Sequence, residues 1–446
     1  MTRLPDNWLS VPIADVVDIN PGVDKSQFKD NEEIPFFPMP AIEAETGRID
    51  TSERRPFGKV KSGFTAFSSG DVLFAKITPC MENGKMAIVP PLPRGVGFGT
   101  TEFHVLRPTG AVNAEYLYYF VSSASLRHEA QHHMTGAVGQ KRVPKRYIET
   151  KPVPLPPLNE QRQIVEKIET LFARLDKGEE AVREVQTLLK RYRQSVLKAA
   201  VTGQLTDADR SEWELLELGE LLEDIRYGTA KKCIPEPHGT AVLRIPNVVA
   251  GNIDLSDLKY TELNEKEVEK LALQLGDVLI VRSNGSANLV ARGAVVGEEA
   301  AGLAYAGYLI RLRLNQQRIL PEFLHLALHS PQTREIIERQ ARSTSGVHNI
   351  NSAEVKSLAI ELPPVDHQRK IVEVTEEAFS KTKNLTKWCE TELKRSASLR
   401  QSILKDAFAG RLVPQDPADE PASALLERIK AEQSTAPKKT GRKATA

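Results

Sequence analysis

A long internal repeat constrains this chain more than any other feature of its sequence. The stretch "LPPLNEQRQIVEKIETLF" at residues 155–172 returns as "LPPVDHQRKIVEVTEEAF" at residues 362–379, a shift of 207 residues. The match continues without a gap to residues 206 and 413, with 18 identities in 52 positions. The shared residues mix Pro, Gln, Arg, Phe and Gly, so biased composition does not explain them. Self-similarity at one fixed period indicates a structural unit that is used twice.

Each copy of the unit has two parts. Residues 1–154 and 207–361 contain short strand-like runs, such as "GDVLFAK" and its counterpart "GDVLIVR", between Gly, Pro and Asn, and predict mixed α/β domains. Residues 155–206 and 362–413 open after Pro-Pro, a helix-start signal, and then continue without proline for over forty residues. We expect residues 414–446 to form a C-terminal tail that is partly disordered, since "STAPKKTGRKATA" is rich in Pro, Ser and Lys.

The two long helical segments have the period of a coiled coil. In the first, apolar or small residues recur in alternating steps of four and three from Ile164 to Ala199. The second keeps this period less well, because Thr375 and Ser396 stand among its seam positions. The fold class that follows is α+β: two mixed domains alternate with two long helices that pair as an antiparallel coiled coil with pseudo-two-fold symmetry. A paired rod of this kind is about 60 Å long.

Composition argues against a membrane-spanning protein, a secreted protein and a protein built on disulfides or zinc. Hydrophobic content is 40%, no apolar run is long enough for a bilayer, and the N-terminal residues lack the apolar core of a signal peptide. The three cysteines, Cys80, Cys233 and Cys389, have no metal-binding spacing, and their number and separation favour a reducing cytoplasm.

Charge is unevenly distributed along the chain. The net charge is +1 overall, but residues 1–150 are neutral, residues 151–206 carry +3, residues 207–361 carry −6 and residues 362–446 carry +4. A protein that binds nucleic acid without base preference is more basic than this. DNA binding therefore requires local basic clusters or the help of a partner.

The middle of each mixed domain differs between the copies. The stretch "FFPMPAIEAETGRIDTSERRPFGKVKSG" has only a weak counterpart in "AVLRIPNVVAGNIDLSDLKYTELNE". Two domains held at a set separation by paired helices suit a long ligand that is nearly two-fold symmetric, and duplex DNA is such a ligand. A shared scaffold with unlike loops then predicts an asymmetric target in two parts.

The helical segments carry a resemblance to a known family. Helices that open with "LPPLNEQ" and "LPPVDHQ" and close with "RQSVLKAAVTGQL" and "RQSILKDAFAGRL" resemble those of the specificity subunit of type I restriction–modification systems, and the tail "PASALLERIKAE" fits as well. The resemblance implies two target-recognition domains that read a bipartite double-stranded DNA sequence. It also implies two methyltransferase subunits bound to the helices, and translocase–nuclease subunits in the full complex. S-adenosylmethionine, ATP and Mg²⁺ would belong to those partners, with no cofactor in this chain.

Two alternatives to a DNA-specificity subunit remain open at this point. Asp71, Glu82 and Lys85 have the residue types of a metal-dependent nuclease. The second copy retains only Asp277, so Asp71 is better interpreted as the cap of a turn before its strand. The other alternative is a coiled-coil assembly scaffold that does not bind DNA. No phosphate-binding GxxxxGK[ST] motif is present, and no metal ligand or catalytic residue is predicted.

Most candidate DNA-contacting residues lie in matching loops of the two domains, and a separate basic cluster in the first domain, Arg54, Arg55, Lys59 and Lys61, is expected to contact the DNA backbone. Arg and Lys suit guanine or phosphate, and Asn and Gln suit adenine edges. The candidates of the first domain are Arg54, Arg55, Lys59, Lys61, Lys76, Thr78, Asn83, Lys85, Gln140, Lys141, Arg142 and Lys145. Those of the second domain are Arg244, Asn247, Arg282, Ser283, Asn284, Ser286, His348 and Asn349.

Residues near the start of both helical segments are predicted to serve the scaffold or a protein partner rather than DNA. The same side chains occupy matching positions in the two copies, and they cannot all serve different bases. These residues are Gln161, Arg162 and Phe172 in the first copy and Gln368, Arg369 and Phe379 in the second.

Overall fold

The computed structural model describes residues 4–137, 139–206, 209–341 and 346–435. The chain divides into two compact units, one of Met1–Glu180 with Glu392–Ala446 and one of Ala181–Thr391. Each unit contains one mixed domain, half of helix α5 (Leu158–Val201) and half of helix α11 (Val365–Phe408). No helix in the described part of the chain has a stretch long and apolar enough for a bilayer.

The domain of the first unit contains two four-stranded sheets and a strand pair. One sheet has the order β2–β9–β6–β7 and is antiparallel, and the other has the order β4–β3–β8–β5 with β3 and β8 parallel. Strand β1 (Leu9–Pro12) pairs with β10 (Pro152–Leu155), directly before α5. The sheet strands are β2 Val17–Ile19, β3 Glu33–Phe37, β4 Arg54–Pro56, β5 Thr65–Ser68, β6 Val72–Ala75, β7 Met86–Ile88, β8 Val96–Gly99 and β9 Phe103–Pro108. The helices of the domain are α1 Phe57–Val60, α2 Ala114–Ser122, α3 Ala124–His132 and α4 Lys145–Thr150.

The domain of the second unit repeats this plan with changes. Its sheet β12–β19–β15–β17 matches the first antiparallel sheet, while its second sheet has only three strands, β14–β13–β18. A strand pair, β11 with β21, again precedes the long helix. The strands are β11 Glu214–Glu217, β12 Leu222–Tyr227, β13 Thr240–Leu243, β14 Lys259–Thr261, β15 Val278–Val281, β16 Ser283–Asn284, β17 Gly293–Val295, β18 Ala304–Tyr305, β19 Leu309–Leu314, β20 His348–Asn349 and β21 Ala359–Leu362. The helices are α6 Ile245–Val248, α7 Glu265–Leu271, α8 Pro321–His329, α9 Pro331–Gln340 and α10 Ser352–Lys356.

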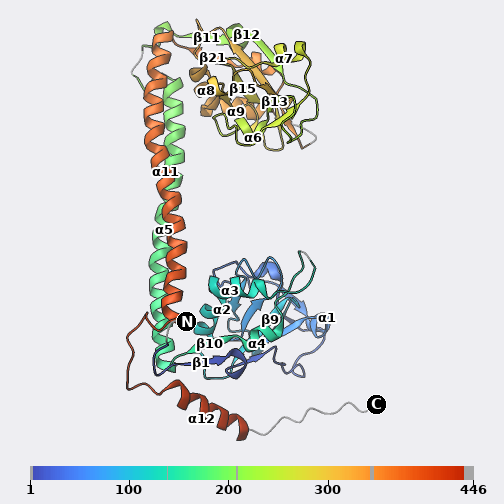
Figure 1. Cartoon of the computed structure of the whole chain (residues 1–446), viewed down its shortest axis with the longest axis vertical. Coiled ribbons are helices and arrows are strands. Elements are labelled where there is room, and N and C mark those ends of the chain that lie inside the picture. The colour runs from blue at the N-terminus through green and yellow to red at the C-terminus, as the bar shows by residue number, and fades with distance from the viewer. Residues whose placement is uncertain (1–3, 138, 207–208, 342–345, 436–446) are drawn as a thin grey trace. The chain divides into compact units, whose positions relative to one another are not determined.

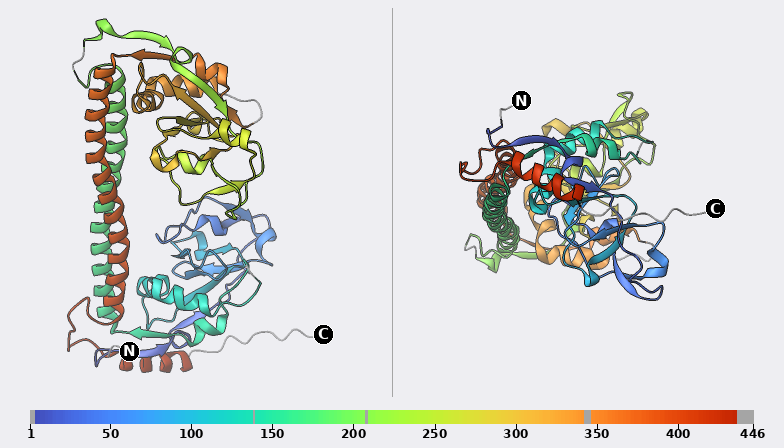
Figure 2. Two further views of the ribbon diagram at one scale, coloured as in Figure 1. Left: turned by 45° about the horizontal axis from the view of Figure 1, so that its top comes forward. Right: turned by 90° about the horizontal axis from the view of Figure 1, so that it is seen from below.

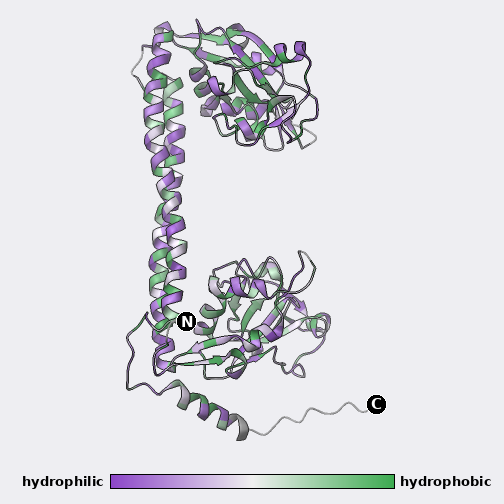
Figure 3. Cartoon of the chain, in the orientation of Figure 1, coloured by the Kyte–Doolittle hydropathy of each residue, from purple (hydrophilic) through white to green (hydrophobic). Residues whose placement is uncertain are grey.

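The two long helices pack together, as the sequence period predicts (Figure 1). In the first unit Arg400 of α11 lies over Phe172 of α5, and in the second unit Arg193 of α5 lies over Phe379 of α11. The start of each helix therefore lies beside the end of the other, which confirms the antiparallel direction. Along both helices purple and green residues alternate, while the strands of the domains are mostly green (Figure 3). The predicted polar interruptions lie in the seam, where Thr375 and Ser396 are buried.

Each helix contributes apolar side chains to the core of the domain beside it. In the first unit, Ile164 and Ile168 of α5 and Leu404 of α11 belong to the same buried cluster as Trp8 and Tyr116. In the second unit, Leu197, Ala200 and Ile371 join the domain core in the same way. Domain and helical pair are therefore one packed body within each unit.

Helix α12 (Ala422–Thr435) lies within the segment that the sequence assigns to the tail. It lies beside β1 (Figure 2), and its residues Ala422 and Leu426 are buried in the core of the first domain. The Ala422 backbone N–H donates to the Asn7 carbonyl at 3.3 Å. The start of the tail is thus ordered because an amphipathic segment finds an apolar surface. Most of the run expected to be disordered, residues 436–446, lies outside the described residues.

Candidate nucleic-acid interface

Two loops of the second domain that are far apart in sequence pair directly in the structure. We name residues 282–292 its strand loop, because they follow the central strand β15, and residues 346–351 its terminal loop. Ser283 pairs with Asn349 and Asn284 pairs with His348, as the two-stranded ribbon β16–β20. The predicted candidates of both loops therefore form one surface element.

The first domain makes the equivalent pairing between its strand loop, residues 76–85, and its terminal loop, residues 139–146. Ile77 forms a bridge with Arg142, and the Thr78 N–H donates to the Lys141 carbonyl at 3.0 Å. The Val143 N–H donates to the Lys76 carbonyl at 2.8 Å. In the internal repeat, Ile77 is equivalent to Ser283 and Arg142 is equivalent to Asn349, so the two pairings occupy the same place in the two domains. Both domains therefore present the same ribbon with different side chains.

Some candidates on the first ribbon are engaged within the domain. Arg142 donates two hydrogen bonds to Glu102, both at 2.8 Å, and this contact lowers the pKa of the Glu102 carboxyl. Lys85 Nζ donates to the carbonyls of Met39 and Ile42, at 3.1 and 2.9 Å, and Thr78 Oγ1 donates to Glu82 at 3.0 Å. Lys145 forms an ion pair with Glu149 at 3.0 Å.

Within the described residues, four candidates on the same ribbon have side chains without a hydrogen-bond or ion-pair partner, so these are the groups available to a ligand. They are Lys76, Asn83, Gln140 and Lys141.

The second ribbon is polar rather than basic. The guanidinium of Arg282 lies 4.6 Å from the ring centroid of Tyr227, and its buried Nε has no partner. The Nδ1–H of His348 donates to the Ala341 carbonyl at 2.9 Å, which fixes the ring. Asn284 Oδ1 accepts from the Ser286 N–H at 3.0 Å, so part of this side chain shapes its own loop.

Two further candidates of the second domain hold a turn. Asn247 is 2% exposed, and its amide donates to the carbonyls of Asp254 and Asp257 at 2.8 and 3.1 Å while accepting from the Arg244 N–H. Arg244 forms an ion pair with Asp257 at 2.6 Å. A base contact by Asn247, which stays a prediction, would require these internal bonds to open first.

In the basic cluster of the first domain, residues 54–61, two of the four basic side chains form ion pairs within the domain. Arg55 forms an ion pair with Glu53 at 2.7 Å and lies 3.7 Å from the ring centroid of Phe36. Lys61 forms an ion pair with Asp30 at 2.8 Å. Arg54 and Lys59 are exposed, and neither side chain has a polar partner among the described residues. Within this cluster, these two side chains are the ones available for contact with a phosphate.

The residues of the nuclease alternative have structural roles. Asp71 is 1% exposed and accepts from Arg107 Nε at 2.7 Å and Nη2 at 2.8 Å, while its Oδ2 also accepts from the Ser68 N–H. Asp277 and Arg313 repeat this pair in the second domain, at 2.9 and 2.8 Å. Asp71 thus caps the turn before β6, as predicted. Among the described residues no group of three His, Cys, Asp or Glu side chains could hold a metal ion.

The predicted scaffold glutamines anchor each long helix to its domain. Gln161 is fully buried, donates to the carbonyls of Ala111 and Pro156, and accepts from the Asn113 N–H at 2.7 Å. Gln368 makes the three corresponding bonds, to Arg318, Pro363 and Leu320. Their neighbours differ in environment: Arg162 is exposed, and Arg369 pairs with Asp366 at 2.7 Å.

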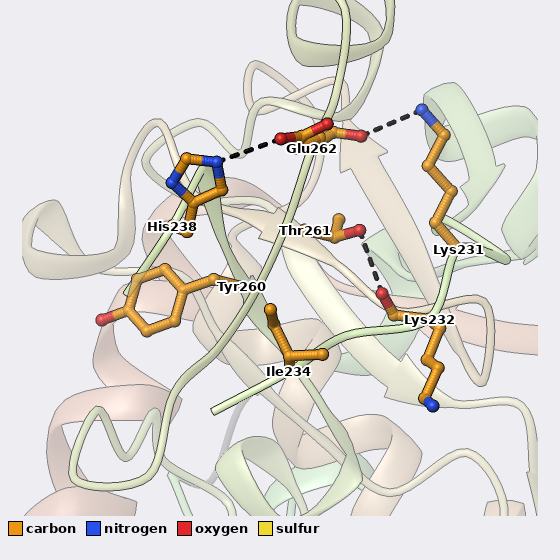
Figure 4. A pocket seen from close by; sticks show the side chains of 7 residues that line it. All are labelled: Lys231, Lys232, Ile234, His238, Tyr260, Thr261 and Glu262. Carbon is orange, nitrogen blue, oxygen red and sulfur yellow. Dashed lines mark hydrogen bonds and ion pairs between the residues drawn. The ribbon is translucent and has the colours of Figure 1, made fainter. Parts of the chain in front are cut away.

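Sequence reasoning missed a polar pocket in the second domain (Figure 4). This cavity of about 410 Å³ is lined by Lys231, Lys232, Ile234, His238, Tyr260, Thr261 and Glu262. Lys231 pairs with Glu267 at 2.6 Å and His238 pairs with Glu262 at 3.0 Å. Most charged side chains of this pocket are paired within the domain, and the pocket shares no residue with the ribbon β16–β20. The pocket is therefore separate from the candidate interface.

Comparison with known proteins agrees with a chain that carries two recognition domains. The family described as "Type I restriction modification DNA specificity domain" matches twice, at residues 5–184 and 210–395. The chain belongs to this family, and it is a specificity subunit of a type I restriction–modification system with two DNA-recognition domains.

Two relatives match over nearly their full length. The chain is 32% identical to the type I restriction enzyme EcoKI specificity subunit of Escherichia coli (strain K12), covering 99% of each chain. It is 30% identical to the StySPI specificity subunit of Salmonella potsdam, again with 99% coverage of both.

Two solved structures share the fold. One, from a study of complex assembly and conformational transition of the type I R-M system, has a TM-score of 0.75 at 23% identity and covers 92% of this chain and 99% of that one. The other is the HsdS subunit from Thermoanaerobacter tengcongensis, with a TM-score of 0.55 at 22% identity and coverage of 92% and 98%.

Proposed function

We propose that each domain reads one half of an asymmetric, bipartite DNA sequence through its ribbon of paired loops. The observation that carries this proposal is that the two ribbons have the same backbone pairing and different side chains. Lys76 and Lys141 stand on the first, whereas Ser283, Asn284 and Asn349 stand on the second. Lysine suits guanine and phosphate, and asparagine suits adenine edges, so equivalent elements read different bases.

Exchange of one recognition region tests this assignment. Residues 23–135 are replaced by the same region of a relative, and the sites methylated by the complex with its methyltransferase partner are mapped. One half of the target sequence changes and the other stays the same. A change in both halves, or in neither, would contradict the assignment of one half-site to each domain.

We infer that the long helices fix the unread spacer between the half-sites. The support is the burial of apolar side chains from α5 and α11 in both domain cores, such as Ile164 in the first and Ile371 in the second, which makes each joint stiff. Insertion of one heptad at matching places in both helices lengthens the spacer and leaves the half-sites unchanged. An unchanged spacer in an assembled, active complex would refute this inference.

We propose that the helices also bind two methyltransferase subunits, and that translocase–nuclease subunits join them in the full complex. An exposed apolar surface in the second unit supports this, since Leu188 and Tyr192 of α5 and Leu385 and Trp388 of α11 are 48–52% exposed. Leu188 and Tyr192 are four residues apart on α5, and Leu385 and Trp388 are three residues apart on α11, so each pair lies on one face of its helix. Exposed apolar patches of this kind mark protein interfaces.

We propose that this chain catalyses no reaction itself and acts in the cytoplasm. S-adenosylmethionine, ATP and Mg²⁺ are then bound by the partner subunits. The engagement of Asp71 by Arg107 supports the lack of catalysis, and the three free cysteines suit a reducing compartment. The purified chain should neither methylate nor cleave DNA, and methylation should require the partner. Methylation or cleavage by the chain alone would overturn this part of the proposal.

A further inference from the structure

Each domain contains a buried arginine on a short helix, and its guanidinium contacts the backbone of the strand loop. Arg127 of α3 is 8% exposed and Arg334 of α9 is 9% exposed. The two residues are 207 positions apart, and both helices begin at a serine, Ser123 or Ser330, whose side chain caps the N-terminus. The two arginines therefore occupy equivalent places in the fold, although the repeated helical motifs do not include them.

The guanidinium of Arg334 binds backbone carbonyls of the strand loop. Its Nη1 donates to the Val290 carbonyl at 2.6 Å, and its Nη2 donates to the Asn288 carbonyl at 3.1 Å. Its carboxylate partner, Glu338, stands on the same helix at 3.3 Å. A buried cation that contacts mainly backbone oxygens fixes the path of the chain, because each carbonyl loses a bond if the loop moves.

Arg127 makes the corresponding contact in the first domain. Its Nη1 donates to the Glu82 carbonyl at 2.6 Å, and its Nη2 donates to the Glu45 carboxylate at 2.8 Å. The guanidinium is close to the loop, since a Cβ atom on Gly84 would lie 2.9 Å from Nη1. Gly84 has φ +68°, and its counterpart Ala291 has φ +57°, so the contacted segment reverses direction at the same place in both domains.

The contacted loops are the ones that carry candidate base-reading side chains. Asn83 lies between Glu82 and Gly84, and the strand loop of the second domain starts with Arg282, Ser283 and Asn284. The arginine binds the C-terminal part of each strand loop, and this restricts the positions that the candidate base-reading side chains of the loop can reach. A loop that is free before binding must be ordered on DNA, at a cost of roughly tenfold in affinity for each backbone residue.

We propose that Arg127 and Arg334 are positioning residues for base recognition, each setting the discrimination at the half-site of its own domain without touching DNA. This inference rests on the proposed function. The new element is that the DNA sequence preference of each ribbon depends on one buried arginine that does not itself contact DNA. Because the two arginines serve different domains, each is the matched control for the other.

The test uses the full chain in complex with its methyltransferase partner. Arg334→Met and Arg127→Met are compared with the unaltered chain on the cognate duplex and on duplexes with one changed base pair in either half. Domain exchange assigns each half-site to its domain. Arg334→Met should lower discrimination at the half-site of the second domain by about tenfold or more and leave the other half within about twofold. Arg127→Met should give the converse result.

Two further measurements separate positioning from folding. Arg334→Lys retains the charge with fewer donors, so it should restore part of the lost discrimination. Hydrogen exchange at residues 283–291 without DNA should be faster in Arg334→Met, while exchange in β15 stays unchanged. Equal loss at both half-sites, or full discrimination with a faster-exchanging loop, would overturn the proposal. If the unaltered complex does not discriminate at either half-site, the proposed function fails instead.

Discussion

Arg400 of α11 lies over the ring of Phe172 of α5, with its guanidinium carbon 5.0 Å from the ring centroid. The same guanidinium pairs with Asp176 at 2.5 Å and with Glu179 at 3.2 Å. The repeat places Arg193 over Phe379 at 4.2 Å in the second unit. There the positions of the two acids are taken by Lys383 and Thr386. The stacking is therefore shared by the two units, and the ion pairs belong to the first alone.

This difference predicts unequal costs for two equivalent substitutions. Arg400→Ala should destabilise the helical pair of the first unit by about 1–3 kcal/mol, because stacking and charged hydrogen bonds are both lost. Arg193→Ala loses the stacking alone and should cost about 0.5–1 kcal/mol in the second unit. Urea unfolding followed by hydrogen exchange in each helix half measures both values. Equal costs would show that the ion pairs of Arg400 contribute nothing to stability.

Asp71→Asn should destabilise the first domain by roughly 3–5 kcal/mol, because it leaves the Arg107 guanidinium without its buried partner. Glu82→Gln is the control, since Thr78 is the one donor to the carboxylate of Glu82 among the described residues. Thermal unfolding with and without Mg²⁺ gives the measurement. If Asp71 bound a metal instead, Mg²⁺ would stabilise the unaltered domain and both substitutions would abolish that effect.

Two adjacent buried histidines predict acid sensitivity of the second domain. The rings of His325 and His329 are 4.2 Å apart, and burial lowers the pKa of His325 to about 4 and that of His329 to about 3. The unfolded chain binds protons near pH 6.5 and the folded domain does not, so stability is complete above that pH and falls as pH drops toward 4. The loss should be on the order of a few kcal/mol.

Hydrogen exchange of the two domains between pH 7 and pH 4 checks this prediction. Tyr118 and Ser122 occupy the equivalent positions of the first domain, where burial lowers the pKa of one histidine, His104. The second domain should therefore lose protection first, and His329→Asn should reduce its pH dependence. Parallel loss in both domains would place the acid response elsewhere.

Trp388→Ala combined with Tyr192→Ala should weaken binding of the methyltransferase subunit by at least about tenfold, because large aromatic side chains dominate protein interfaces. The recognised DNA sequence should not change. Lys387→Ala, at an exposed neighbouring position, serves as the control. Unchanged affinity in titration calorimetry would exclude this surface as the docking site.

Arg162 and Arg369 test whether the starts of the two long helices contact a protein partner. Replacing both with alanine should weaken assembly of the complex and leave the recognised sequence unchanged, because the buried glutamines beside them hold the domains in place. Size-exclusion chromatography with the partner and mapping of methylated sites give the two readouts. An altered sequence preference would instead assign these arginines to DNA.

The sequence by itself determined the two-fold repeat, the two long helices and the capping role of Asp71. These features depend on contacts between residues three or four apart, or on the same short motif occurring twice, and such patterns are visible in a linear chain. The strand-like runs around Val72 and Val278 were predicted for the same reason, and they form β6 and β15.

Only the tertiary structure decided which of these parts meet. Ser283 and Asn349 pair across 66 residues, and Arg107 reaches Asp71 across 36, because the domain core fixes the register of its strands. Arg127 and Arg334 stand on short helices like many exposed arginines, and nothing in the local sequence shows that they are buried against a loop. Helix α12 is ordered by an apolar surface on a domain some 300 residues away in sequence. Contacts of this kind depend on the packing of the whole domain, which no local pattern encodes.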